Sequence, residues 1–132
     1  MKPTDLMIKD WVLWKNRYVQ IVQISGIVYS FGHIDILLAH CNDVGDGIET
    51  HDISKISPIP LTAEILEKNG WERNGIFMEK RIDENTHLRW ADICGSVLSQ
   101  GNYYMCDCKY VHTLQHALRL CGFDELANNF KI

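Results

Sequence analysis

The sequence predicts an α+β protein with an antiparallel, strand-rich body, a meander or a small barrel, and two short helices, one mid-chain and one C-terminal. Residues 11–40 are dense in β-branched and aromatic side chains and are broken at intervals by turn-forming residues, which is typical of short antiparallel strands. Two later segments carry the start and stop signals of helices, and an Asn-Gly pair between them indicates a hairpin.

Length and composition are those of one globular domain. The chain has 132 residues, of which 46% are hydrophobic and 23% charged, so it can bury a core without disulfides or metal ions. We expect a single domain over residues 1–132, with a strand-rich part at 1–57, a helix and a hairpin at 58–108, and the C-terminal helix at 109–123.

The N-terminal part is predicted to divide into short strands. Apolar runs at residues 18–24, 27–31 and 34–38 are separated by glycines, as in a meander. Residues 42–47 are rich in glycine, asparagine and aspartate and are predicted to form a loop. Residues 48–53 are expected to be the next strand.

The first helix is predicted to begin after Thr62, a favoured N-cap residue. Two prolines within residues 57–60 end the preceding strands, because proline lacks the backbone donor that a sheet needs. Gly70 supplies the left-handed conformation that follows many helices, and Trp71 then stands where it covers Leu66. This is the pattern of a Schellman stop.

A hairpin is predicted between the two helices. Asn74 and Gly75 accept the positive φ angles of a type I′ turn, so we expect them to be its two central residues. Strands are expected over residues 76–81, 88–93 and 103–106, where they form a second sheet or extend the first.

The second helix is predicted over residues 110–121 and ends as the first does. Gly122 takes the left-handed position, and Phe123 is placed to cover Leu118. One face of this helix is expected to be an apolar stripe that docks on the sheet.

The opposite face of this helix carries the first candidate site. His112, His116 and Arg119 lie within about 60° of one another on a helical wheel, with Gln115 alongside. Such a group of donors suits a carboxylate, a phosphate or a partner's carbonyl. The alternative is an ordinary solvated helix face.

Two tryptophans are the other candidate ligand-binding residues. Trp11 and Trp14 are three positions apart, so in a strand they face opposite sides, and we do not expect both of them to be core residues. An exposed tryptophan can stack on a base or nucleotide. The alternative is packing in a core.

Cysteines and histidines allow two further sites. Cys106, Cys108, His112 and His116 include ligand types that zinc prefers, but the spacing is tight, and small buried cysteines are often core residues. A Cys–His nucleophile pair could use Cys41 or Cys94 with any of the six histidines, but no spacing places such a pair together. We therefore expect no metal, no cofactor and no catalytic residues.

Charge and composition exclude several classes of protein. The chain has 17 acidic and 13 basic residues, a net charge of −4, which argues against non-specific nucleic-acid binding. No stretch has the pattern of a signal peptide or the length of a membrane span. We expect a cytoplasmic protein that does not bind membranes, and its five cysteines are expected to be reduced.

Three segments resemble a family of uncharacterised proteins found in Bacteroidetes genomes, their phages and mobile elements. Residues 5–12 resemble the family's start L-R-I-G-N-W-V, with Lys9 in place of the glycine. Residues 59–71 are similar to I-P-L-T-E-E-x-L-x-K-x-G-F, and residues 109–115 to K-Y-V-H-x-L-Q. The resemblance implies a phage or mobile-element setting, in a host cytoplasm, and it implies no reaction.

The function expected from these observations is binding without catalysis. The ligand would be a host protein or a small nucleotide-like molecule, and the action would be directed against host defence. Two alternatives stay open: a zinc-dependent or thiol enzyme that uses His112, His116 and the nearby cysteines, and a small-barrel nucleic-acid-binding protein. Homo-oligomerisation is left open.

Overall fold

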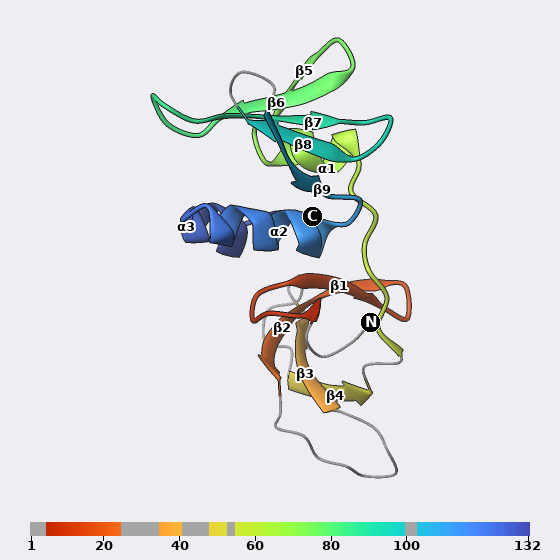
Figure 1. The fold of residues 1–132 in the computed structure, drawn as a ribbon. Helices are drawn as coiled ribbons and strands as arrows, with labels where there is room; N and C mark the ends of the chain where they lie inside the picture. The colour runs from red at the N-terminus through yellow and green to blue at the C-terminus, as the bar shows by residue number, and fades with distance from the viewer. Residues whose placement is uncertain (1–4, 25–34, 41–47, 53–54, 100–102) are drawn as a thin grey trace. The chain divides into compact units, whose positions relative to one another are not determined.

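The computed structural model describes residues 5–24, 35–40, 48–52, 55–99 and 103–132 (Figure 1). The chain divides into two compact units, residues 1–59 and residues 60–132. The N-terminal unit contains an antiparallel sheet, and the C-terminal unit contains a second antiparallel sheet with a mid-chain helix and C-terminal helices. The predicted α+β class is confirmed, whereas the single domain stays a prediction.

The N-terminal unit contains a four-stranded antiparallel meander, as predicted. Its order is β1-β2-β3-β4, so each strand pairs with the next one along the chain. The strands are β1 Trp11–Trp14, β2 Arg17–Ile24, β3 Asp35–His40 and β4 Ile48–Asp52. The strand predicted at 27–31 and the loop predicted at 42–47 lie outside the described residues.

Two tight turns in this unit place lysines in the left-handed region. Lys15 and Asn16 connect β1 to β2 with φ angles of 46° and 62°, the signature of a type I′ hairpin turn. Lys9 precedes β1 with a φ of 72°. It is the position at which the resembling family has glycine, and the backbone there adopts the conformation that glycine favours.

The core of the N-terminal unit is small. Two backbone hydrogen bonds of 2.9 Å join Leu13 to Ser57 within this unit. Trp14 and Ile24 pack against a cluster of buried residues, which are Leu6, Val12, Val19, Ile21 and Ile56.

The C-terminal unit contains a five-stranded antiparallel meander in the order β5-β6-β7-β8-β9. Its strands are β5 Glu72–Asn74, β6 Phe77–Arg81, β7 His87–Ala91, β8 Ser96–Ser99 and β9 Tyr103–Asp107. Three of them correspond to the strands expected at 76–81, 88–93 and 103–106. β8 was not predicted, and β5 was implied only as the first arm of the predicted hairpin; both are short, and β5 consists of polar residues alone.

The hairpin between β5 and β6 has a different turn from the predicted one. Asn74 pairs with Phe77, so the two loop residues are Gly75 and Ile76. Gly75 alone has a positive φ, 62°, which fits a type II′ turn. The predicted type I′ turn centred on Asn74 and Gly75 is wrong because the Asn74 side chain binds the Glu79 carboxylate, at 3.2 Å, from within the strand.

The mid-chain helix α1, Ala63–Lys68, begins and ends as predicted. The Thr62 hydroxyl accepts a hydrogen bond from the Ile65 amide at 3.3 Å. At the other end, Gly70 has a φ of 81°, and the Trp71 amide donates to the Leu66 carbonyl at 3.1 Å. These are the bonds of a Schellman stop.

The C-terminal helix α2, Val111–Leu120, also ends in the predicted stop. The Phe123 amide donates to the Leu118 carbonyl at 2.8 Å, next to Gly122 with a φ of 85°. A third helix, α3 Asp124–Asn128, follows and was not predicted.

The three helices lie on the same side of the five-stranded sheet (Figure 1). Met78, Trp90 and Val97 form one cross-strand row on β6, β7 and β8 and are buried. The Trp90 indole N–H donates to the Cys108 carbonyl at 2.9 Å, which ties the row to the segment after β9. Trp90 is therefore a core residue.

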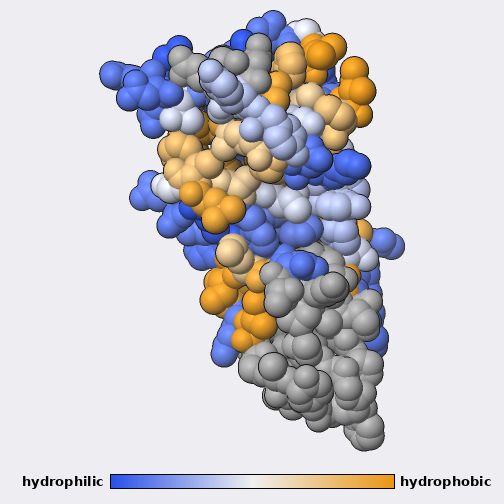
Figure 2. Space-filling view, viewed as in Figure 1, coloured by the Kyte–Doolittle hydropathy of each residue, from blue (hydrophilic) through white to orange (hydrophobic). Residues whose placement is uncertain are grey.

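The outer face of this sheet carries a cluster of charged side chains on β6 and β7. The Glu79 carboxylate lies 2.8 Å from the Arg89 guanidinium and 3.6 Å from the His87 imidazole. Apolar residues share this face, since Arg89 pairs with Leu98 and Leu98 with the exposed Tyr104. Figure 2 likewise shows hydrophilic and hydrophobic residues side by side on the described surface.

Candidate functional site

The donor group predicted on α2 is not an exposed patch. The Gln115 side chain is fully buried, and its amide Nε2 donates to the Ala127 carbonyl at 2.9 Å. Helix α3 follows α2 after Gly122, so it supplies the carbonyl that removes Gln115 from the solvated face. Both the donor patch and its alternative, a solvated face, are wrong for Gln115, because the unpredicted helix α3 brings the Ala127 carbonyl to its amide.

His112 is also buried, with 7% of its surface exposed. Its ring stacks on Tyr110 with the centroids 6.0 Å apart, and it meets the edge of His116 at 5.6 Å. Arg119 donates to the Asn128 side-chain oxygen at 3.4 Å. The four predicted residues are therefore close in sequence on α2, but two of them are buried and Arg119 bonds to α3.

The two candidate tryptophans face opposite sides of β1, as predicted. Trp14 shares the face of Val12 and packs against the core of the N-terminal unit, and the Lys15 ammonium lies 4.9 Å from its ring centroid. Trp11 is on the other face and is 7% exposed. The expectation that the two cannot both be core residues is wrong, because Trp11 is buried and Trp14 packs against the core. Whether either binds a ligand stays a prediction.

The cysteines and histidines considered for zinc do not converge. The Cys106 and Cys108 sulfurs lie 3.6 Å apart, while His112 packs on Tyr110 and His116. Among the described residues, no group of three or more histidine, cysteine, aspartate or glutamate side chains is arranged to hold a metal ion.

The nucleic-acid-binding alternative would gain support if the N-terminal basic residues Lys2, Lys9, Lys15 and Arg17 shared one face. Lys9 precedes β1, whereas Lys15 and Arg17 lie at the hairpin that follows it. They stand at opposite ends of a strand and do not form one cluster. Lys2 lies outside the described part of the chain.

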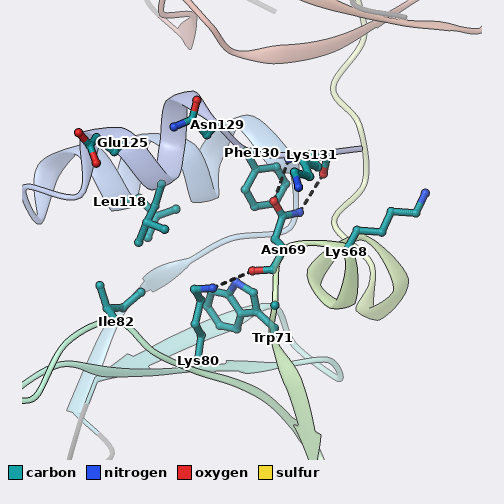
Figure 3. Close-up of a pocket in the computed structure, with 12 residues that line it drawn as sticks. Lys68, Asn69, Trp71, Lys80, Ile82, Leu118, Glu125, Asn129, Phe130 and Lys131 are labelled. Atoms are coloured by element: carbon teal, nitrogen blue, oxygen red, sulfur yellow. Dashed lines mark hydrogen bonds between the residues drawn. The ribbon is translucent and has the colours of Figure 1, made fainter.

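A pocket in the C-terminal unit gathers residues that are far apart in the sequence. It has a volume of about 430 Å³ and lies between the end of α1, strand β6 and helices α2 and α3 (Figure 3). Its large apolar lining residues are Trp71, Ile82, Leu118, Leu126 and Phe130. Its size is within the range of pockets that hold small ligands.

The pocket has an excess of positive charge. Lys68, Lys80 and Lys131 contribute to its lining, against a single carboxylate from Glu125. Figure 3 shows that the Lys68 side chain points away from the pocket, whereas Lys80 extends across it towards Asn69. Lys80 is therefore the cation best placed to meet a ligand.

The position of Lys80 depends on the end of α1. Its ammonium donates to the Asn69 carbonyl at 2.8 Å, one of the carbonyls that a helix leaves without an intrahelical partner. A Cβ atom added to Gly70 would lie 3.0 Å from this ammonium. Glycine at position 70 thus serves both the left-handed helix stop and the approach of the lysine.

Asn69 also fixes the opposite wall of the pocket. Its side-chain amide donates to the Lys131 carbonyl and its side-chain oxygen accepts from the Lys131 amide, both at 2.8 Å. The same Nδ2 donates to the Ile65 carbonyl at 2.8 Å. Through these bonds, one asparagine holds the C-terminal segment beside α1.

No protein-family model, curated protein or solved structure matches this chain. The resemblance to the Bacteroidetes family consequently stays a prediction. No helix in the described ranges has the length and apolar character needed to cross a membrane.

Sequence reasoning missed the pocket. Trp71 and Gly70 were interpreted only as the end of a helix, and no pattern drew attention to Lys80 or Phe130. The one usable signal was the basic residues near the Gly-Trp pair. These basic residues indicate a pocket only when the fold is known, because folding places residues 125–131 beside Asn69.

The pocket can hold an anion beside a flat apolar group. Lys80 offers a charge-assisted hydrogen bond to a carboxylate or phosphate, and the rings of Trp71 and Phe130 offer an apolar wall. Such a combination is typical of sites that bind small molecules with one polar and one apolar part.

Proposed function

We propose that this protein is a non-enzymatic binding protein that takes a small, nucleotide-like anion in the pocket of its C-terminal unit. The observation that carries the proposal is the placement of the Lys80 ammonium in a pocket walled by Trp71 and Phe130. A phosphate would replace or share the Asn69 carbonyl as the acceptor of Lys80. The base would lie against the aromatic wall.

Charge and volume both support an anionic ligand of this size. Although the Lys68 side chain points away, Lys80 and Lys131 still outnumber the single carboxylate of Glu125 in the lining, so a ligand with a negative charge is favoured over a cation of the same shape. A mononucleotide is compatible with a pocket of about 430 Å³.

The proposed biological setting comes from the sequence resemblance. In a phage or mobile element, a protein that binds a nucleotide without consuming it can withdraw a host signal, and this action would take place in the host cytoplasm. Binding of a host protein is the alternative within the same class, and the pocket favours the small ligand.

Isothermal titration calorimetry with a panel of nucleoside monophosphates and cyclic dinucleotides tests the proposal. We expect at least one to bind the full chain, and Lys80→Met to weaken that binding about tenfold or more, because a charge-assisted hydrogen bond is lost. Lys55→Met changes an exposed lysine outside the pocket lining and is the matched control.

Three outcomes would overturn the proposal. Absence of binding across the panel would exclude a nucleotide as the ligand. Equal weakening by Lys80→Met and Lys55→Met removes the pocket as the site. Turnover of a bound nucleotide, detected by chromatography after incubation, removes the non-enzymatic class.

A further inference from the structure

Cys106 and Cys108 form a close pair of thiols at the end of the five-stranded sheet. Cys106 belongs to β9 and pairs with Val97 of β8, and Cys108 follows two residues later. Because alternate residues of an extended chain share a face, both side chains project to the same side. Their sulfur atoms are 3.6 Å apart.

We infer that Cys106 and Cys108 are a redox-active dithiol that reacts with small-molecule disulfides and closes reversibly into an intramolecular disulfide. The inference is independent of the pocket and of the ligand proposed for it. The contact between the two sulfurs carries it, since thiol–disulfide exchange needs a second thiol within reach of the first.

The reaction is balanced by one molecule of disulfide substrate. The Cys106 thiolate attacks one sulfur of the substrate, forms a mixed disulfide and releases the other half as a thiol. Cys108 then loses its proton and attacks the Cys106 sulfur, and the second half of the substrate leaves as a thiol. The protein dithiol is oxidised by two electrons, and the substrate is reduced to two thiols.

The surroundings of the two cysteines assign their order of reaction. Cys106 is partly exposed, so a substrate can reach it, whereas Cys108 is fully buried. Burial, together with the neighbouring Cys106, raises the pKa of the Cys108 thiol above its ordinary value. A substrate cannot reach Cys108 first, but Cys108 lies 3.6 Å from the Cys106 sulfur, so its position suits it to resolve a mixed disulfide on Cys106.

The backbone of Cys108 is fixed on both sides. Its carbonyl accepts from the Trp90 indole at 2.9 Å, and its amide donates to the Gly95 carbonyl at 2.7 Å. The sulfurs must approach by about 1.5 Å to reach disulfide bond length. The movement falls mainly on Cys106, at the end of β9, and the resulting strained ring is expected to be readily reduced.

The other described cysteines do not compete for this contact. Cys94 and Cys121 are both exposed. The Cys94 sulfur bonds to the Ser96 hydroxyl at 3.2 Å and has no sulfur neighbour within the described residues. Among the described cysteines, an intramolecular disulfide is therefore expected only between Cys106 and Cys108.

The test uses the full chain carrying Cys94→Ser, because Cys94 shares the tryptic peptide 90–109 with both cysteines. The reduced protein is incubated with glutathione disulfide, free thiols are alkylated in denaturant, and the peptide is analysed by mass spectrometry. We expect loss of two alkylated thiols from the peptide and a mass lower by two hydrogens than that of the reduced, unalkylated form. Both changes should be reversed by dithiothreitol.

Two variants separate the roles of the thiols. In the same background, Cys108→Ser is expected to accumulate a stable glutathione adduct on Cys106, and Cys106→Ser to gain neither an adduct nor a disulfide. Full alkylation of both cysteines after oxidation would overturn the inference, as would an adduct that forms on Cys108 first. Circular dichroism of each variant shows whether it is folded, and native-state alkylation of Cys121 serves as the internal control.

Discussion

The side-chain amide of Asn69 pairs with the backbone of Lys131 as a second strand would. It donates to the Lys131 carbonyl and accepts from the Lys131 amide, both at 2.8 Å, across 62 positions of sequence. The pairing joins the end of α1 to the end of the chain. One wall of the proposed pocket depends on it.

Asn69→Asp is expected to destabilise the C-terminal unit by about 1–3 kcal/mol, because the Ile65 and Lys131 carbonyls lose their donor. The carboxylate keeps the acceptor for the Lys131 amide. Urea denaturation of the full chain measures the change. Removing residues 131–132 should reduce the effect of the substitution, and an effect of equal size in the shortened chain would contradict the pairing.

Lys9→Gly is expected to stabilise the N-terminal unit by about 0.5–1 kcal/mol. A φ of 72° costs lysine about 1–2 kcal/mol, and part of the relief is offset by the larger freedom of glycine in the unfolded chain. The bonds from Lys9 to Ile21 and from Gln20 to Lys9 use the Lys9 backbone and are retained.

Hydrogen exchange of amides in β2 measures this gain as an increase in protection of about two- to fivefold. Lys55→Gly is the control, since Lys55 is exposed and is not among the residues with positive φ. It should leave protection unchanged or lower it. A loss of protection in Lys9→Gly would show that the left-handed turn is not formed.

Gln115→Glu is expected to cost at least about 2 kcal/mol at pH 7, because it removes the donor to Ala127 and buries a charge. Gln20→Glu is the matched control, since the Gln20 amide makes an exposed bond to the Lys9 carbonyl, and it should cost less than about 1 kcal/mol.

The loss in Gln115→Glu should shrink as the pH falls towards about 4, since burial favours the protonated acid. Thermal unfolding at several pH values, compared with the wild-type chain, measures this trend. A pH-independent loss would show that the introduced carboxyl group reaches solvent.

The Cys94 thiol is expected to alkylate at lower pH than an ordinary cysteine. The Ser96 hydroxyl, 3.2 Å from the sulfur, lowers the pKa of Cys94, and the charge of Asp107 acts in the opposite direction. The rate follows the thiolate, so it should rise at a pH below the usual range. Ser96→Ala should shift the rise in alkylation rate to higher pH, and Asp107→Asn should shift it to lower pH.

Iodoacetamide labelling at a series of pH values, with the site localised by tandem mass spectrometry, gives these profiles. Cys121 reports the intrinsic pH dependence of the reagent in the same sample. Identical profiles for the wild type and Ser96→Ala would remove the hydroxyl as the cause.

The two helix stops were predicted from the sequence because they are local. Each depends on a glycine that accepts a positive φ and on hydrogen bonds that span six residues, as at Gly70 and Gly122. The N-cap at Thr62 and the strands of the N-terminal meander followed for the same reason, since short-range backbone preferences determine them.

The exposure of the α2 face could not be read from its residues. A helical wheel separates polar from apolar side chains, but it does not show that α3 follows and brings the Ala127 carbonyl to Gln115. The hairpin at Asn74 differed by one residue for a similar reason, since its register depends on the pairing of β5 with residues 77–79 of β6.

The sequence by itself determined the α+β class, the meander of short strands and the ends of both predicted helices, because these follow from backbone preferences within a few residues. The tertiary structure alone decided which polar side chains are buried and which ones meet. Asn69 and Lys131, or Lys80 and Phe130, are brought together by chain folding over tens of residues. Contacts of that range depend on the complete packing of the unit, and no local pattern encodes them.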